Sequence, residues 1–411
     1  MVSIRCNQLT RWCARRRGLG RALRMGHAMG FSLGAMMGLV RSYRRAQNEV
    51  SLCLGRRERI QETTFSLDSF SSEDCLSLFR FLPHHIVKLV SLLHLVVPFP
   101  RSRLAVDPVE CFCVVLRRLA SPCRWYDMEE LFGRHAPALC VIFYATLEVL
   151  MHRWDPLLSE WRVDFLRERA ALYSTRIEEA GAYLDKCVGF IDGTTIFVSR
   201  PGRGFQRACY SGHKRRHAIK FQSVITPDGL IAHLFGPWEG RRHDMTLYHE
   251  SGLDAVLSDA LVIQGVQHDI YGDAAYLVRP WLQASFRGVM TPNEEVCNKT
   301  MKVPRSAVEW GFKDVKQVCA FLDFPRKLKF RDGPVGLFYR AGALIWNLRC
   351  CAYGSATADF FKCPPPSWEV YLGSLPGLGG QGAAAGSTSG EESGPSGAGG
   401  AGEGGDDAGG A

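Results

Sequence analysis

Val188-Gly189-Phe190-Ile191-Asp192-Gly193 is the stretch that decides the fold of this 411-residue chain. Its small and apolar residues, ending in an Asp-Gly pair, predict a buried strand followed by a turn. Residues 195–198 predict another strand, and residues 218–226 and 230–235 predict a hairpin around Pro227-Asp228-Gly229. A helix at 245–257, strands at 262–266 and 268–271, and an amphipathic helix at 306–322 complete the pattern. Strands followed by alternating helices and strands predict an α/β fold.

Four carboxylates lie in or beside these elements: Asp192, Asp244, Asp273 and Glu309. Hard cations such as Mg²⁺ bind oxygen ligands, so carboxylates delivered by several elements to one point predict a metal site. Two such ions can stabilise both the attacking and the leaving oxygen of a phosphodiester. The set therefore predicts a metal-dependent nuclease core with these four residues as metal ligands.

Each carboxylate also has a structural explanation. Asp192-Gly193 is a common turn pair, and Asp244 could cap the helix at 245–257. Ser306 and Glu309 have the spacing of a capping box, in which the glutamate side chain binds the cap amide. The order and spacing of the acids favour the site: 81 residues separate Asp192 from Asp273, and 36 separate Asp273 from Glu309.

The ordered motifs resemble the PIF/Harbinger-type DDE superfamily endonucleases, including the harbinger transposase-derived nucleases. The resemblance covers about residues 105–352. It rests on four motifs: Ile191-Asp192-Gly193-Thr194, His243-Asp244, Gly272-Asp273-Ala274-Ala275-Tyr276 with Arg279-Pro280-Trp281-Leu282, and Val308-Glu309-Trp310-Gly311-Phe312. The family often has a basic residue and a second glycine near the last acid, where this chain has Trp310 and Lys313-Asp314.

The resemblance implies an RNase H-like DDE catalytic core that uses a divalent metal cation, Mg²⁺ or Mn²⁺, in two copies. Asp192, Asp273 and Glu309 take the catalytic positions, and Asp244 takes the additional acidic position after the hairpin. The implied reaction is the hydrolysis and joining of DNA phosphodiester bonds. A Myb-like DNA-binding partner protein is implied by the family alone, and the number of copies in an assembly stays open, a homo-oligomer included.

A helical region is predicted ahead of this core, over residues 60–185. Pro108 predicts the start of a helix that Pro122 ends, a short helix stops at Gly133, and a third begins after His135. Three helices with tight turns fit a helix-turn-helix-like region with Arg117, Arg118, Arg124 and Arg134 around it. The alternative is an ordinary helical subdomain that packs on the core.

Local basic clusters, rather than the formal net charge of +9, are the expected DNA contacts. They comprise Lys214, Arg215 and Arg216 before the hairpin, Arg241 and Arg242 beside Asp244, and Arg326, Lys327 and Lys329 after the last helix. Lys and Arg neutralise phosphates without reading the base sequence. Solvated loops are the alternative for each cluster.

The two ends differ from the middle in composition. Residues 1–47 hold ten arginines and no acid, which predicts a disordered arm that is a nuclear-import or DNA-contacting segment, a mitochondrial transit peptide, or an extension without a role. Residues 364–411, rich in Gly, Ala and Ser, predict a disordered acidic tail. The 15 cysteines include no Cys-x-x-Cys and predict reduced thiols. No apolar stretch is long enough to predict a membrane span.

Together these features predict a transposase-derived DNA endonuclease of the nucleus, with no membrane partner. The alternative is a domesticated DNA-binding protein that keeps the same fold and has no cleavage activity. The presence of all four acids favours the nuclease. A hydrolase for other phosphoesters is a third alternative, which the basic loops disfavour.

Overall fold

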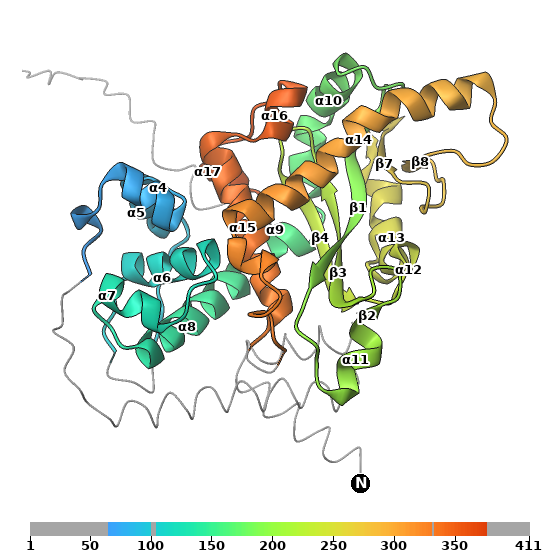
Figure 1. Cartoon of the computed structure of the whole chain (residues 1–411). Helices are drawn as coiled ribbons and strands as arrows, with labels where there is room; N and C mark the ends of the chain where they lie inside the picture. Colours follow the sequence, from blue (N-terminus) through green and yellow to red (C-terminus); the bar gives the residue numbers. More distant parts are fainter. Residues whose placement is uncertain (1–64, 100–103, 331–332, 376–411) are drawn as a thin grey trace, which may run out of the picture. The chain divides into compact units, whose positions relative to one another are not determined.

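Helices form the first part of the computed structural model, which describes residues 65–99, 104–330 and 333–375 (Figure 1). Ser71 caps the first α-helix through its Oγ, which accepts from the backbone N–H of Asp74 at 3.0 Å. The elements are η1 (Leu67–Ser69), α4 (Ser72–Phe79), α5 (Pro83–Leu92), α6 (Pro108–Ala120), η2 (Tyr126–Met128), α7 (Glu129–Phe132), α8 (Ala136–Trp154), α9 (Pro156–Ser159) and α10 (Val163–Glu179).

Two arginines expected on the surface of this region are used inside it. Arg118 is only 7% exposed, and its guanidinium lies over the rings of Trp125 and Phe321 at 4.3 and 4.6 Å. Arg134 forms an ion pair with Glu110. Arg118 is therefore unavailable to DNA. The prediction that Arg117, Arg118, Arg124 and Arg134 form a positive surface is wrong for Arg118. The helix-turn-helix interpretation stays a prediction.

A mixed sheet follows, in the strand order β2-β3-β1-β7-β8 with β4 also paired to β3. Its strands are β1 (Cys187–Phe197), β2 (Tyr210–Ser211), β3 (Arg216–Ile225), β4 (Ile231–Glu239), β7 (Asp269–Gly272) and β8 (Leu282–Ala284). β1 is antiparallel to β3 and parallel to β7, and β7 is parallel to β8. The prediction of an α/β fold is confirmed at this level.

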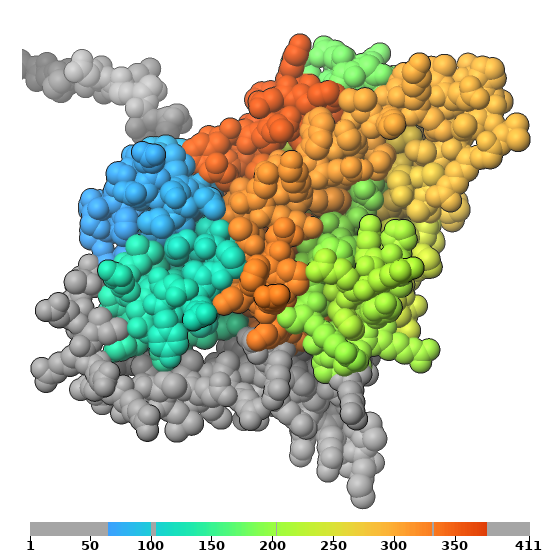
Figure 2. Space-filling view, in the orientation of Figure 1, coloured from blue at the N-terminus to red at the C-terminus, as the bar shows by residue number. Residues whose placement is uncertain are grey.

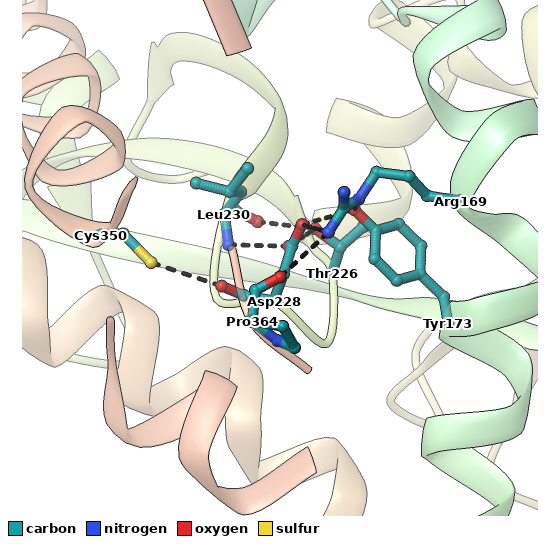
Figure 3. Close-up of polar contacts among 7 residues, drawn as sticks. All are labelled: Arg169, Tyr173, Thr226, Asp228, Leu230, Cys350 and Pro364. Atoms are coloured by element: carbon teal, nitrogen blue, oxygen red, sulfur yellow. Dashed lines mark hydrogen bonds and ion pairs between the residues drawn. The ribbon is translucent and has the colours of Figure 1, made fainter. Parts of the chain in front are cut away.

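The β3–β4 hairpin forms at the predicted Pro227-Asp228-Gly229 turn. Gly229 has φ +81°, a left-handed conformation that glycine adopts without strain. Asp228 is fully buried there, and its Oδ1 accepts from Thr226 Oγ1 at 2.6 Å and from Leu230 N at 3.3 Å (Figure 3). These two bonds hold the turn from within.

Several short elements connect the longer ones: α11 (Arg203–Cys209), α12 (Asp244–Glu250), α13 (Leu253–Ala260), β5 (Val262–Ile263) and β6 (Val266–Gln267). The single helix predicted at 245–257 is two helices, because Gly252 adopts φ +68° between them. β5 and β6 pair around Gln264 and Gly265, which both have positive φ, as a two-residue hairpin requires. The sequence pattern did not predict β8.

The longest helix, α14 (Pro292–Val318), crosses the sheet and packs on β1 and β3 (Figure 1). It begins with a capping box formed by Thr291 and Glu294. The sequence predicted the start of this helix near Ser306, which is wrong by about four turns. Pro304 lies inside the helix, where its missing N–H leaves one backbone bond unmade.

The chain continues through η3 (Ala320–Asp323), α15 (Val335–Tyr353), α16 (Ala356–Phe361) and α17 (Trp368–Gly373). The prediction of a disordered tail from residue 364 is wrong for residues 364–375, because Trp368, Tyr371 and Leu372 of α17 are buried. Residues 376–411 and the predicted arm at 1–47 lie outside the described residues. The described residues belong to one compact unit ending at Leu375, and their cysteines are free thiols.

Helix α8 is long and apolar enough for a membrane span by length and composition alone. It packs against α6 and α15, and Leu139, Phe143, Leu147 and Leu150 on it are buried. These contacts are those of a core helix.

Candidate active site

Asp192 lies in the middle of β1, not in a turn after it. Residues 190–197 pair continuously with β3, with Asp192 opposite Ser223, so the predicted turn at Asp192-Gly193 is wrong. The carboxylate Oδ1 accepts from the backbone N–H of Gly193 at 2.7 Å. Burial raises the pKa of Asp192 to about 6; the charges of Asp273 and Asp244 act in the same direction, and the Gly193 N–H and Arg305 oppose them.

Asp273 comes directly after β7. This strand pairs with β1, which carries Asp192. The parallel register places Ile191 beside Gly272, so the two residues that come next, Asp192 and Asp273, are neighbours across the strands. The Asp273 Oδ1 accepts from the backbone N–H of Ala275 at 2.9 Å. The sheet therefore brings together two of the acids that the sequence separates by 81 residues.

Tyr276 packs against Gly272, the residue before Asp273. A Cβ on Gly272 would lie 2.6 Å from its ring, so the close packing requires glycine at position 272. The Tyr276 Oη accepts from Gln222 Nε2 at 3.0 Å. Burial, followed by the charges of Asp192 and Asp244, raises the pKa of the Tyr276 hydroxyl well above its ordinary value. The sequence marked Tyr276 only as part of a motif.

Asp244 is the first residue of α12 and does not cap it, because the N-cap position belongs to His243 and no side chain makes a cap bond there. Its Oδ1 lies 3.0 Å from Lys220 Nζ on β3. Its carboxylate also lies against Gly193, where a Cβ would overlap it. Since Asp192 and Gly193 point to opposite faces of β1, Asp244 approaches from the face opposite to the Asp192 side chain.

Glu309 lies in the body of α14, so the capping-box explanation at Ser306 is wrong. Its side chain is 57% exposed. Its Oε1 lies 3.0 Å from an Nη of Arg305, one helical turn earlier, and the other Nη of Arg305 lies 3.6 Å from Asp192 Oδ2. One guanidinium therefore connects the acid on α14 with the acid on β1.

Sequence reasoning missed Arg305 and Lys220. The i,i+4 spacing of Arg305 and Glu309 on a helix was a readable signal for the first ion pair. The Lys220–Asp244 pair has no local signal, because it depends on how α12 packs on β3.

The donor set fits hard divalent cations, because all four groups are carboxylates. Across residues 65–99, 104–330 and 333–375, no three His, Cys, Asp or Glu side chains are grouped closely enough to hold an ion as they stand. In this conformation Arg305 and Lys220 pair with three of the carboxylates. A metal would be held by Asp192, Asp273 and Glu309, with Asp244 approaching from the other face of β1.

The predicted basic clusters fall into two groups. Lys214 and Arg215 are exposed in the turn before β3, Arg216 is exposed as its first residue, and Arg326 and Lys329 are exposed near Leu328. Arg241 and Arg242 instead share Glu239 Oε2, at 2.9 and 3.1 Å, which offsets part of their charge.

Backbone hydrogen bonds bring the cluster at 214–216 and the cluster at 326–329 together at the end of β1. Val198 N donates to His217 O at 3.0 Å, and Ser199 N donates to Leu328 O at 3.0 Å. Figure 2 shows the two segments side by side, in green and orange. We refer to Lys214, Arg215, Arg216, Arg326, Lys327 and Lys329 as the basic surface.

Comparison with known proteins gives a consistent result. The family model of DDE superfamily endonucleases matches residues 191–332, the segment that contains all four acids. The human protein named "Putative nuclease HARBI1" is 23% identical over 267 residues, 64% of this chain and 72% of that protein. The Bos taurus protein of the same name is 22% identical over 265 residues, with the same coverage. No solved structure matches the chain. The resemblance to DDE superfamily endonucleases is confirmed for residues 191–332.

Proposed function

We propose that this chain is a divalent-metal-dependent DNA endonuclease of the DDE type. The observation that carries the proposal is the pairing of β1 with β7, which makes Asp192 and Asp273 neighbours. The match of residues 191–332 to DDE superfamily endonucleases supports the same reaction class. A nuclease of this family acts on DNA, and Mg²⁺ or Mn²⁺ would supply water activation and stabilise the leaving oxygen.

In this proposal the chain's own residues position the reacting groups. Asp192, Asp273 and Glu309 are the catalytic acids and metal ligands. Asp244, expected as a further ligand, lies against the opposite face of β1 and pairs with Lys220, so it is not proposed to share their ion. Gln222 Nε2 donates to Tyr276 Oη at 3.0 Å and to the backbone oxygen of Asp244 at 3.4 Å, which ties the start of α12 to β3 and to the segment after β7. Because β1 and β7 are held by a parallel ladder, Asp192 within β1 and Asp273 directly after β7 are positioned by rigid elements, as precise catalysis requires.

An RNase H-like core is part of the proposal. It is supported by a sheet in which β4 and β3 are antiparallel neighbours and β7 and β8 continue parallel to β1. With it we propose the division into a helical region at 60–185 and a catalytic domain at 186–352. A nuclear location and a Myb-like partner are proposed from the family resemblance and the Arg-rich residues 1–47.

The test is nicking of supercoiled plasmid, and of the terminal-repeat DNA of a related transposon, by the purified chain with Mg²⁺ or Mn²⁺. EDTA removes the metal and should abolish cutting. A gel shift in EDTA measures DNA binding separately. A chain that binds DNA but never cuts it with either metal contradicts the nuclease proposal.

A second candidate is a DNA-binding protein that keeps the fold without cleavage. The ion pairs of Arg305 and Lys220 favour it, because they occupy carboxylates that metals would need. In that case the basic surface would still bind DNA, and the nicking assay would be negative while the gel shift stays positive.

A further inference from the structure

Within residues 65–99, 104–330 and 333–375, Arg305 is the only cation that forms ion pairs with two of the proposed catalytic acids. It projects from α14 between Glu309 on its own helix and Asp192 on β1. Its side chain is 23% exposed, and that of Asp192 is 19% exposed. The pair is therefore partly shielded from water, where an ion pair is stronger than at the surface.

The acids need a counter-charge when no metal is bound. The charges of Asp273 and Asp244 both raise the pKa of Asp192. All three carboxylates also raise the pKa of the Tyr276 hydroxyl, so they lie close to one another. Like charges in a partly buried cluster repel one another. Arg305 supplies one positive charge to this cluster, and Lys220 supplies another at Asp244.

A divalent cation cannot share the place that Arg305 holds. Mg²⁺ and Mn²⁺ contact their carboxylate oxygens directly at about 2.0–2.2 Å, which leaves no room for a guanidinium between the same two oxygens. The Glu309 side chain is 57% exposed, so Arg305 and Glu309 have space to separate from each other.

We propose that Arg305 is a built-in counter-cation, which holds Asp192 and Glu309 in the metal-free chain and must be displaced before a divalent cation can bind there. The inference rests on the proposed metal dependence of the site. It makes metal binding an exchange of one cation for another, so the Asp192–Arg305–Glu309 pairing lowers the apparent metal affinity. Arg305 is in this sense a positioning residue of the acids.

The test compares the full chain with Arg305→Met, which keeps the length of the side chain and removes its charge. Mn²⁺ is the probe, and free Mn²⁺ is measured by electron paramagnetic resonance during a titration. Arg305→Met should bind Mn²⁺ about tenfold more tightly than the wild type. Its Tm in EDTA should be lower, and the rise in its Tm on adding Mn²⁺ should be larger.

Lys302→Met is the matched control, because Lys302 is an exposed cation on the same helix, about one turn before Arg305. Its Mn²⁺ affinity should stay that of the wild type. Arg305→Lys is the second variant, for use if Arg305→Met does not fold. An ammonium cannot bridge two carboxylates as a guanidinium does, so its Mn²⁺ affinity should lie between those of the wild type and Arg305→Met.

The outcomes separate the inference from the function it rests on. If the wild type binds Mn²⁺ and Arg305→Met binds it equally or more weakly, the counter-cation inference is overturned and the metal site stands. If neither the wild type nor any Arg305 variant binds Mn²⁺, both the inference and the proposed metal dependence are overturned.

Discussion

Asp273 follows β7, the strand beside β1, so replacing it by Asn changes the charge next to Asp192 with little change in shape. Asp273→Asn should lower plasmid cleavage in Mg²⁺ or Mn²⁺ by at least about a hundredfold, because an amide is a far weaker ligand for a hard cation. DNA affinity in EDTA should stay within about a factor of two, since phosphate contacts come from Lys and Arg. Asp185→Asn, at an exposed carboxylate before β1, is the control for surface charge. If Asp273→Asn cuts as fast as the wild type, the assignment of the acids is wrong even where the fold is right.

His233 on β4 is a second residue with a measurable signature, away from the acids. It is 4% exposed, and burial, followed by the charge of Arg340, lowers its pKa to about 4. The unfolded chain binds a proton at this residue below about pH 6.5, whereas the folded chain does so only below about 4. Stability supplied by neutral His233 is therefore complete above pH 6.5 and is lost as the pH falls toward 4.

His233→Phe removes this titration. Between pH 7.5 and pH 5.0 the wild type should lose about 2 kcal/mol more unfolding free energy than the variant. Urea unfolding of both proteins at the two pH values measures the difference, and the other titrating groups cancel in the comparison. Equal losses would mean that His233 is protonated in the folded chain at pH 5.

At the scale of elements, the β3–β4 hairpin is tied to α10 by buried polar contacts. Tyr173 Oη donates to Asp228 Oδ2 at 2.5 Å, and Arg169 lies 3.4 Å from the same oxygen (Figure 3). Cys350 Sγ on α15 donates to the Asp228 backbone oxygen at 3.3 Å. The turn therefore fixes two helices against the sheet that carries Asp192.

Asp228→Ala should reduce the unfolding free energy by about 3–5 kcal/mol, because it leaves Arg169 partly buried without its carboxylate and removes the internal bonds of the turn. Denaturant unfolding measures the loss. The control is Asp164→Ala on α10, whose side chain is 96% exposed and lies 3.9 Å from Arg167; it should cost less than about 0.5 kcal/mol. A loss at Asp228 no larger than at Asp164 would refute this role of the turn.

The sequence predicts the elements well where local chemistry decides them. The β3–β4 hairpin follows from Pro227-Asp228-Gly229, and α6 follows from the prolines at 108 and 122 that start and end it. The prediction fails where tertiary pairing overrides a local signal. Asp192-Gly193 has turn chemistry, yet β3 and β7 keep it in a strand. The early half of α14 is polar, and its start depends on the Thr291–Glu294 box rather than on the apolar pattern after Ser306.

The candidate site divides in the same way. The identities of the four acids are readable from their motifs, because each lies in a short distinctive context. The cations that pair with them are not, since Lys220 reaches Asp244 only through the packing of α12 on β3. Sequence position alone also does not reveal that Asp244 and Asp192 approach β1 from opposite faces.

At the scale of the whole chain, the basic surface and the acids lie along the same strand. Ser199, which binds Leu328, is seven residues beyond Asp192 along β1 and the segment after it. At about 3.3 Å per extended residue the two features are about 20 Å apart. A duplex that contacts both would span about six base pairs between them. We therefore expect bound DNA to run from the basic surface toward the acids.

Replacing Lys214, Arg215 and Arg326 together by Ala tests this path. Each lost phosphate contact should reduce the slope of log K against log salt concentration by about 0.9, so the triple variant should bind duplex DNA more weakly and with a flatter salt dependence. Its cleavage at saturating DNA should stay close to that of the wild type, because the three residues lie away from the acids. The control carries Ala at Arg153, Lys186 and Lys362, three exposed cations outside the basic surface, and has the same net charge. If both triple variants change the slope equally, binding depends on net charge alone and the basic surface has no special part in it.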